Sequence, residues 1–233
     1  MEQNKRITIV SKFKVKGIES IIKKSGFDIV RKDPDFVLCY GGDGTILRSE
    51  RFFPGIPKIV IKKRSSICRK CDYTLDYLKT ILERIAKGRY KIIEESKLVA
   101  KSKNKKLIGL NEIQLHNKMP TRAIRFSLKI NGRKIDSLLG DGVIVSTPFG
   151  STAYYSSTEG KPFKKGIGIS FNNLHKKKIK SFVVPENSRI EVGIKRGPAW
   201  IIADNYEKFI GVDRGDKILI QKAEEEARFV EIS

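Results

Sequence analysis

An acidic residue stands among three glycines in the stretch "FVLCYGGDGTILRSE", residues 36–50. The apolar residues 36–40 predict a buried strand, and the apolar spacing after Thr45 predicts a helix. Open α/β sheets bind ligands at such loops, where a strand ends and a helix begins. Glycines let the backbone approach phosphate oxygens, and the helix start offers free N–H groups. Asp43 is the odd element, because a carboxylate repels phosphate unless it serves proton transfer or metal binding.

A second stretch with a similar texture is "LLGDGVIVSTPFGSTAYYSSTEG", residues 138–160. It places Asp141 between two glycines, then a buried strand, then a sharp turn at 148–150. Ser151 and Thr152 follow as candidate caps of a short helix. A strand, a glycine turn and a hydroxyl-rich helix start predict a second backbone cradle for a polar ligand.

The third stretch is "GLNEIQLHN", residues 109–117, where Asn111 and Glu112 interrupt a strand-like run. Adjacent strand residues point to opposite faces of a sheet. At least one of the two side chains is therefore expected to be buried, unless a bulge or a bound ligand accommodates both.

The elements that must position these residues fall into two groups. The first ninety residues alternate strands (6–10, 35–40 and 57–62) with helices (17–26, 45–53 and 72–88). Apolar strands without polar alternation, separated by helices, indicate a parallel sheet covered on both faces. After Tyr90, strand follows strand, with a strong hairpin signal at Asn131-Gly132 and a weaker one at Asp204-Asn205.

We therefore expect an α/β N-terminal domain with a Rossmann-like parallel sheet over 1–89, and a C-terminal all-β sandwich domain over 90–233. Whether the last strand, "RFVEIS", returns to the first domain stays open. No apolar run approaches the roughly 18 residues of a membrane span. The start "MEQNKRITIV" has no signal-peptide pattern. These features predict a soluble cytoplasmic protein with no membrane partner.

The net charge is +22 over 233 residues. Such a charge favours polyanions, including nucleic acid and polyphosphate. The alternative is a lysine-rich surface without a specific partner, because the basic residues are spread along the chain and cluster only at 58–64 and 175–180. Aromatic residues do not gather among the lysines, so no specific nucleic-acid partner is expected.

Three cysteines provide no disulfide framework. Cys68 and Cys71 form one C-x-x-C pair, and Cys39 lies in an apolar strand. A zinc site needs about four ligands, and no second pair supplies them. Two ordinary thiols are the favoured interpretation of Cys68 and Cys71, and a redox pair is the alternative.

The three stretches, in this order, resemble the NAD kinase family. "GGDGT" at 41–45, "NE" at 111–112 and "GDGVIVSTPFGSTAYYSS" at 140–157 match its signatures nearly residue for residue. The first motif is also found in diacylglycerol, sphingosine and phosphofructo-kinases, whereas the STP-x-GSTAY element is far narrower. The resemblance implies phosphoryl transfer from ATP or polyphosphate to the adenosine-ribose 2′-hydroxyl of NAD, giving NADP. It also implies Mg²⁺ or another divalent cation to accompany the donor phosphates, and a homo-oligomer, dimer or tetramer.

The resemblance assigns roles residue by residue. Asp43 matches the proton acceptor, and the phosphate cradle is shaped by Gly41, Gly42, Gly44 and Thr45, with Asp43 and Gly44 also facing NAD. Asn111 and Glu112 match residues that hold adenine and ribose hydroxyls. Asp141 matches the acid at the nicotinamide end, and Arg122 matches an arginine near the substrate. The adenosine pocket is lined by the matching segment Thr152, Ala153, Tyr154, Tyr155, Ser156 and Ser157. No metal ligand is assigned.

Each role has a structural alternative. Asp43 alone could cap its helix, Asp141 could be an ordinary turn residue, and Asn111 could satisfy a bulge. Tyr154 could belong to the core, and Arg122 could be a solvated loop charge. His116 is expected to make a structural hydrogen bond.

The sequence departs from the family after the third strand. The usual glycine-rich segment is replaced by "VIKKRSSICRKC", with the basic side chains Lys62, Lys63, Arg64 and Arg69. For this reason the sequence does not decide the identity of the phosphoryl donor or the residues at the rim of the substrate pocket. Three rival functions also remain: a lipid kinase, an NAD(H)-binding regulator without turnover, and a basic nucleic-acid or polyphosphate-binding protein.

Overall fold

The computed structural model describes residues 4–14, 16–63, 68, 71–176 and 179–232. Two members of the basic segment after the third strand, Arg64 and Arg69, lie outside the described residues, as do 177–178 of the second basic cluster. The chain forms two compact units: unit 1 comprises 1–95 and 225–233, and unit 2 comprises 96–224. No helix in the described part of the chain has the length and apolarity needed to cross a membrane.

Unit 1 is built on a largely parallel sheet. Its strands occur in the order β2-β1-β3-β4-β19-β6, with β5 paired to β4. All these pairings are parallel except β19 with β6. The strands are β1 (Lys5–Ser11), β2 (Phe27–Ile29), β3 (Phe36–Gly41), β4 (Lys58–Lys62), β5 (Tyr73–Thr74), β6 (Tyr90–Glu95) and β19 (Ala227–Ile232). The helices are α1 (Ile18–Lys24), α2 (Asp43–Phe52), η1 (Leu75–Tyr77) and α3 (Leu78–Ala86).

Helices cover both faces of this sheet. On one face, Ile7, Leu38 and Ile61 belong to a core cluster that also contains buried residues of α1 and α3. On the other face, Val37 and Cys39 form a cluster with Val10, and Phe53, just past the end of α2, packs against it. Alternate residues of β3 thus enter opposite cores, which explains why the strand is apolar without polar alternation.

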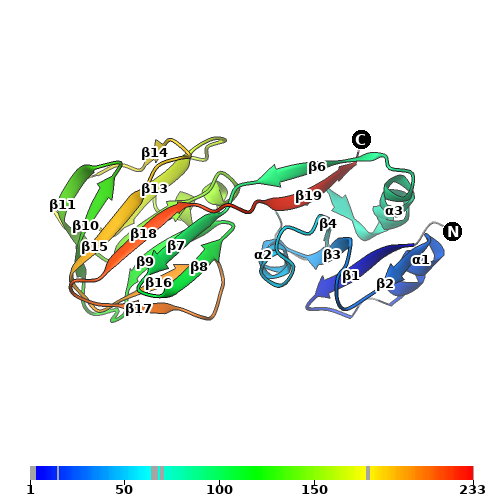
Figure 1. Cartoon of the computed structure of the whole chain (residues 1–233), viewed down its shortest axis with the longest axis horizontal. Coiled ribbons are helices and arrows are strands. Elements are labelled where there is room, and N and C mark those ends of the chain that lie inside the picture. Colours follow the sequence, from blue (N-terminus) through cyan, green and yellow to red (C-terminus); the bar gives the residue numbers. More distant parts are fainter. Residues whose placement is uncertain (1–3, 15, 64–67, 69–70, 177–178, 233) are drawn as a thin grey trace. The chain divides into compact units, whose positions relative to one another are not determined.

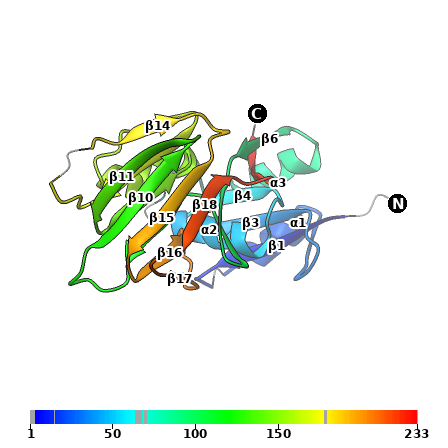
Figure 2. The same cartoon turned by 60° about the vertical axis from the view of Figure 1, so that its left-hand side comes forward.

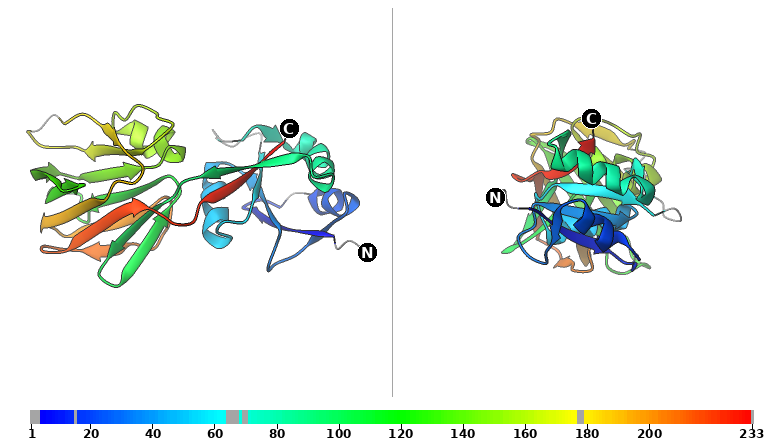
Figure 3. Two further views of the ribbon diagram at one scale, coloured as in Figure 1. Left: turned by 45° about the horizontal axis from the view of Figure 1, so that its top comes forward. Right: turned by 90° about the vertical axis from the view of Figure 1, so that its right-hand side faces the viewer.

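The C-terminal strand belongs to unit 1. β19 pairs with β6 along its whole length and touches β4 in register at Phe229 and Lys58. Figure 1 and Figure 3 show β19 lying beside β6. The last strand therefore returns to the first unit. Because β6 is part of the same sheet, the division falls after Glu95, one strand later than the boundary expected at 89/90.

The cysteines differ from the favoured expectation. Cys68 and Cys71 form a disulfide with their Cα atoms 5.5 Å apart, so they are not two free thiols. Cys39 is free and buried in β3. Burial raises the pKa of its thiol to about 12, so Cys39 is an inert packing residue.

Unit 2 is a β-sandwich. One sheet has the order β11-β10-β15-β18-β7-β8 and the other β14-β13-β12-β9-β16-β17, as Figure 2 shows for β10, β11, β15 and β18. The first sheet contains β7 (Leu98–Ser102), β8 (Lys105–Gly109), β10 (Ile124–Ile130), β11 (Arg133–Gly140), β15 (Ile190–Arg196) and β18 (Lys217–Lys222). The second contains β9 (Glu112–Asn117), β12 (Gly142–Ser146), β13 (Ile167–Asn172), β14 (Phe182–Val184), β16 (Ala199–Ala203) and β17 (Ile210–Val212).

A single apolar cluster joins the two sheets. Phe126, Val192 and Ile220 come from the first sheet, and Leu115, Val145 and Ile201 from the second. The expected hairpin at Asn131-Gly132 connects β10 to β11, with φ angles of 48° and 90° at the two turn residues. Positive φ at both positions is what the two-residue turn of a hairpin requires. The expected fold class, an α/β domain followed by an all-β sandwich, is confirmed.

Candidate active site

The Gly-Gly-Asp-Gly-Thr stretch joins β3 to α2. Gly41 ends the strand, Gly42 precedes the helix, and Asp43 is the first helical residue. A Cβ on Gly41 would overlap the Thr45 hydroxyl, so a side chain here would force the Thr45 side chain to move. The N–H of Thr45 donates to the Gly42 carbonyl at 2.8 Å. Gly41 and Thr45 are buried and shape the turn, whereas Gly42, Asp43 and Gly44 are half-buried and carry its accessible surface.

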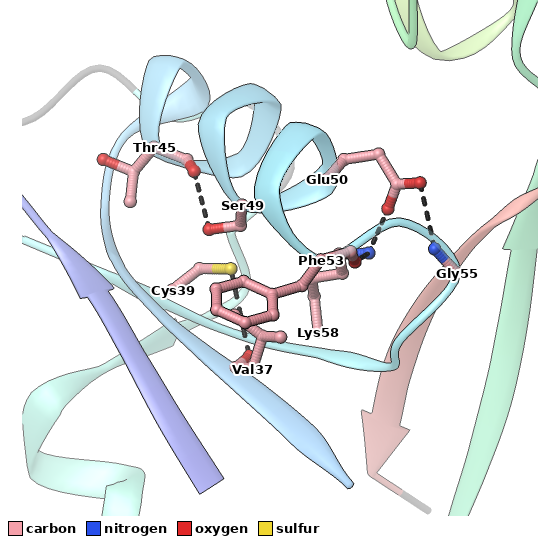
Figure 4. Close-up of polar contacts among 8 residues, drawn as sticks. All are labelled: Val37, Cys39, Thr45, Ser49, Glu50, Phe53, Gly55 and Lys58. Carbon is pink, nitrogen blue, oxygen red and sulfur yellow. Dashed lines mark hydrogen bonds and ion pairs between the residues drawn. The ribbon is translucent and has the colours of Figure 1, made fainter. Parts of the chain in front are cut away.

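The far end of α2 is held by a buried ion pair, which Figure 4 shows. Glu50 is 5% exposed and Lys58 0%, and the Lys58 ammonium donates to the Glu50 carboxylate. Lys58 Nζ also donates to the Phe53 carbonyl at 2.9 Å, and Gly55 N–H donates to Glu50 Oε1 at 3.2 Å. The pair therefore ties the end of α2 and its following turn to the first residue of β4. It fixes the helix that begins at Asp43.

In unit 2, the second and third stretches of interest pack directly on one another. The Thr147 N–H donates to the Asn111 carbonyl at 2.9 Å, and the Thr147 hydroxyl donates to the Leu110 carbonyl at 2.6 Å. The Gly150 N–H in turn donates to the Thr147 hydroxyl at 3.0 Å. A Cβ on Gly150 would overlap the Asn111 backbone. Glycine is thus required where the Ser-Thr-Pro turn crosses the Asn-Glu segment.

Asp204 fixes the same segment from the turn after β16. Its carboxylate accepts the backbone N–H groups of Leu110 at 2.9 Å, Asn111 at 2.8 Å and Glu112 at 3.2 Å. The sequence indicated only a hairpin turn at this position, with no link to residues more than ninety positions earlier. The sequence signal was the Asp204-Asn205 pair, residue types that favour turns, and the structure gives Asp204 a positive φ of 49°.

Glu112 is buried at this junction, as expected for one member of the Asn-Glu pair. Its side chain is 4% exposed, whereas Asn111 is half-buried. Oε1 accepts the Gln114 amide at 3.3 Å, and Oε2 has no hydrogen-bond partner in the described part of the chain. Burial, and next the nearby Asp204 carboxylate, raise the pKa of Glu112 to about 8. Glu112 is therefore mostly neutral at pH 7.

Asp141 lies at the other end of β12. Asn117 Nδ2 donates to its Oδ1 at 3.2 Å, and Asn173 Nδ2 donates to its Oδ2 at 2.7 Å. Asp141 lies five positions before Ser146, the register partner of Glu112, a span of about 16 Å at roughly 3.3 Å per strand residue. The structure therefore does not bring Asp141 next to the Asn-Glu segment.

Arg122 and His116 lie on the Asp141 side of unit 2. The Arg122 side chain is exposed, and its carbonyl accepts from Asn117 Nδ2 at 3.2 Å. His116 Nδ1 lies 3.0 Å from the Asn117 carbonyl, a structural hydrogen bond as expected. Asn117 thus links the Arg122 loop to Asp141 through its single side chain, a connection that sequence reasoning missed.

The segment after the Gly150 turn comprises η2 (Phe149–Thr152) and α4 (Tyr154–Ser157). Tyr155 is 1% exposed and packs edge-on against Phe163, with ring centroids 5.4 Å apart. It anchors the segment inside the unit, so its ring faces the core and not the surface. Thr152, Ala153 and Ser156 are half-buried, whereas Tyr154 and Ser157 are exposed.

A cavity of about 560 Å³ opens beside this segment. Its lining includes Ser157 and Asn173, the partner of Asp141. Its volume falls within the range of small-molecule sites. Ser157 is the member of the expected NAD-binding set that lines this cavity.

A family model described as "ATP-NAD kinase C-terminal domain" matches residues 110–232. An NAD kinase of Sulfurisphaera tokodaii is 37% identical over 185 residues, covering 77% of this chain and 72% of the relative. The chain belongs to the NAD kinase family. A second NAD kinase, from Thermoplasma acidophilum, is 29% identical over 214 residues, covering 90% of this chain and 78% of the relative. The chain is therefore an enzyme of the kinase class that acts on NAD.

Solved structures of NAD kinases have the same fold. The yeast NADH kinase complexed with NADH superposes with a TM-score of 0.88 at 16% identity, covering 100% of this chain and 84% of that one. An NAD kinase from Archaeoglobus fulgidus in complex with ATP gives 0.83 at 23% identity, covering 99% and 94%. At these identities the likeness supports the architecture, and the roles of individual residues rest on the geometry above.

Proposed function

We propose that this NAD kinase transfers the terminal phosphoryl group of ATP to the adenosine-ribose 2′-hydroxyl of NAD. The 2′ oxygen forms a bond to the γ-phosphorus as the bond from that phosphorus to the β-phosphate oxygen breaks, giving NADP and ADP. The hydroxyl proton passes to the Asp43 carboxylate. The supporting observation is that the narrow Ser-Thr-Pro motif of unit 2 is hydrogen-bonded to the Asn-Glu segment through Thr147, which also accepts the Gly150 N–H.

Asp43 suits the role of proton acceptor. A sugar hydroxyl is a poor nucleophile at neutral pH, and a positioned carboxylate contributes about 10²–10⁴-fold by taking its proton. The residue sits in the first turn of α2, whose far end is anchored by Glu50 and Lys58. An anchored helix holds the carboxylate without the entropy of a free loop, which is what positioning a general base requires.

The donor phosphates are proposed to lie over the turn at Gly42 and Gly44, at the start of α2. The helix N-terminus favours negative charge. Gly41 and Thr45 support this turn from beneath. ATP is the proposed donor, and inorganic polyphosphate offers the same terminal phosphoryl chemistry.

A divalent cation, Mg²⁺, is proposed to accompany the donor. Among the described residues, no group of three or more His, Cys, Asp or Glu side chains could hold a metal ion. This fits the usual behaviour of Mg²⁺, which is held mainly by substrate phosphates and water. When bound, the cation offsets charge on the donor phosphates, and the chain's own residues orient the sugar and remove its proton.

NAD is proposed to bind unit 2 through the Asn-Glu segment and the segment after the Gly150 turn. Asn111 and Glu112 would contact the adenosine half, together with Thr152, Ala153, Tyr154, Ser156 and Ser157. Asp141, and Arg122 near it, would contact the nicotinamide half, because an extended dinucleotide can span the distance of about 16 Å along β12. A cytoplasmic location and a homo-oligomer complete the proposal.

The test is to incubate the purified protein with NAD, Mg²⁺ and either ATP or polyphosphate, and to measure NADP with an NADP-specific dehydrogenase. NADP formation with ATP is expected. Binding of NAD without NADP formation under any donor would favour the alternative of a regulator without turnover.

A further inference from the structure

The Asn-Glu segment contains a carboxyl group whose surroundings do not suit a carboxylate. We propose that Glu112 serves the nucleotide site as a neutral carboxylic acid that donates a hydrogen bond from Oε2, and that Asp204 is the positioning residue that keeps it in this form. This inference rests on the proposed function, because it names the hydrogen-bond polarity of the same NAD site.

The Asp204 carboxylate holds the backbone of the Asn-Glu segment. Three backbone N–H groups, from Leu110, Asn111 and Glu112, converge on its carboxylate at 2.8–3.2 Å. The Asp204 N–H returns a bond to the Glu112 carbonyl at 3.1 Å. A carboxylate that accepts several backbone N–H groups is stabilised in its ionised form. These bonds favour a negative charge on Asp204 and fix the backbone that carries Glu112.

The position of Glu112, buried near Asp204, disfavours its ionised form. A second negative charge close to an ionised carboxylate is disfavoured, and burial at 4% exposure removes the water that would offset it. Both effects act in the same direction, and together they raise the pKa of Glu112 to about 8. The proton therefore stays on Glu112 at neutral pH.

The two carboxyl oxygens of Glu112 differ in their hydrogen bonds. Oε1 already accepts the Gln114 amide at 3.3 Å, while Oε2 is buried without a partner in the residues that the structure describes. In an ionised Glu112 this atom would be a charged acceptor with no donor. In a neutral Glu112 it carries an O–H that can donate to a ligand. A buried donor without a partner is costly, and a bound acceptor recovers that cost.

The neighbouring groups that the structure describes do not supply another partner for Glu112. On β12 the register partner is Ser146, whose hydroxyl donates to the Thr147 carbonyl at 3.0 Å. The Thr147 hydroxyl is committed to Leu110 at 2.6 Å. Along β9 itself, Gln114 is neutral and His116 bonds the Asn117 carbonyl. The charge that acts on Glu112 comes from Asp204.

The ligand chemistry follows from this polarity. The group that meets Glu112 must be a hydrogen-bond acceptor, such as a ring nitrogen of adenine or an oxygen of the ribose. Only the protonated fraction of Glu112 is competent to donate, so the apparent NAD dissociation constant rises as that fraction falls. With a pKa of about 8, raising the pH from 7 to 9 should weaken NAD binding about tenfold.

The experiment compares E112Q with E112A by calorimetric titration of NAD from pH 6 to 9. Glutamine keeps the shape and a neutral N–H donor, whereas alanine keeps neither. E112A is expected to lose at least about tenfold in affinity at pH 7, and E112Q should recover most of that loss with no weakening toward pH 9. An E112Q variant as impaired as E112A, or a wild-type affinity that does not change from pH 7 to 9, would overturn the proposal.

A ligand-free measurement separates this inference from the proposed function. In protein labelled with ¹³C at glutamate carboxyls, the Glu112 signal, assigned by its loss in E112Q, should titrate near pH 8. It should titrate at lower pH in D204N. A wild-type midpoint below pH 6 refutes the inference even if the enzyme makes NADP. A midpoint near 8 in a protein that forms no NADP upholds the neutral acid and refutes the proposed function.

Discussion

Replacing Lys58 with methionine should strongly destabilise unit 1. Lys58 is 0% exposed, and its ammonium bonds both Glu50 and the Phe53 carbonyl. Methionine fills similar space and removes the charge, so the Glu50 carboxylate stays buried at 5% exposure without this cation. Because the helix that begins at Asp43 ends at this pair, the change also loosens the element that carries the proposed proton acceptor.

The magnitude follows from the burial of both partners. Removing one member of a buried ion pair costs about 3–5 kcal/mol, because the remaining buried charge loses its opposite charge. Removing both charges in E50Q/K58M leaves mainly the hydrogen bonds of the α2–β4 turn weakened, about 1–2 kcal/mol. Glutamine can still accept the Gly55 N–H that now reaches Glu50 at 3.2 Å. The double variant should therefore be more stable than K58M alone, with a coupling of about 2 kcal/mol or more.

The assay is denaturant unfolding at pH 7 of wild type, both single variants and the double variant. K79M is the matched control, because Lys79 pairs with Glu83 at 3.8 Å with side chains 74% and 49% exposed. That surface pair should contribute less than about 0.5 kcal/mol. A loss below about 1 kcal/mol in K58M, or strict additivity in the double variant, would refute the importance given to the buried pair.

Three further predictions concern unit 2. The pKa of Glu112 rises from its ordinary 4.5 to about 8 on folding, so the contribution of this group to stability is fully present below pH 4.5 and is lost as pH rises through 8, by at most about 5 kcal/mol. Melting curves of E112Q should lack this loss, and parallel wild-type and E112Q pH profiles would contradict it. G150A should force the Asn111 backbone away, lowering stability by about 1–3 kcal/mol and NAD affinity at least about tenfold, as calorimetry can measure. In D141N, the new amide N–H group would face one of the two amide donors, Asn117 or Asn173, that bond the Asp141 carboxylate. This change should destabilise unit 2 by about 1–3 kcal/mol, and unchanged unfolding would contradict the two bonds.

Much of the fold was predictable because periodicity is a local property. The three strands of the first ninety residues, the hairpin at Asn131-Gly132 and the change to an all-β texture all follow from side-chain spacing and turn chemistry. Two short elements were missed. β2, at Phe27–Ile29, is too short to show a period, and Tyr73–Thr74 pairs with β4 where one long helix was expected. Pairing with a distant strand decided both cases, and no local pattern reports it.

At the site, too, the sequence could not predict contacts between segments that are distant in the chain. Lys58 appeared in the sequence only as a member of the basic cluster 58–64, with no partner indicated, but it is buried and pairs with Glu50 of α2 across the α2–β4 turn. Asp204 appeared as a turn residue, although its carboxylate organises a segment more than ninety residues earlier. Motif spacing indicated candidate reacting groups, whereas the residues that hold them depend on contacts between segments distant in the sequence.

The most direct test of phosphoryl transfer assisted by Asp43 is NADP formation by D43N, supplied with saturating NAD, ATP and Mg²⁺. Asparagine keeps the size of the side chain but cannot accept the 2′-hydroxyl proton as a carboxylate does. The expected result is a fall in kcat of at least about 100-fold, with NAD affinity within about threefold of wild type. A D43N enzyme that makes NADP at the wild-type rate would contradict the role given to this carboxylate.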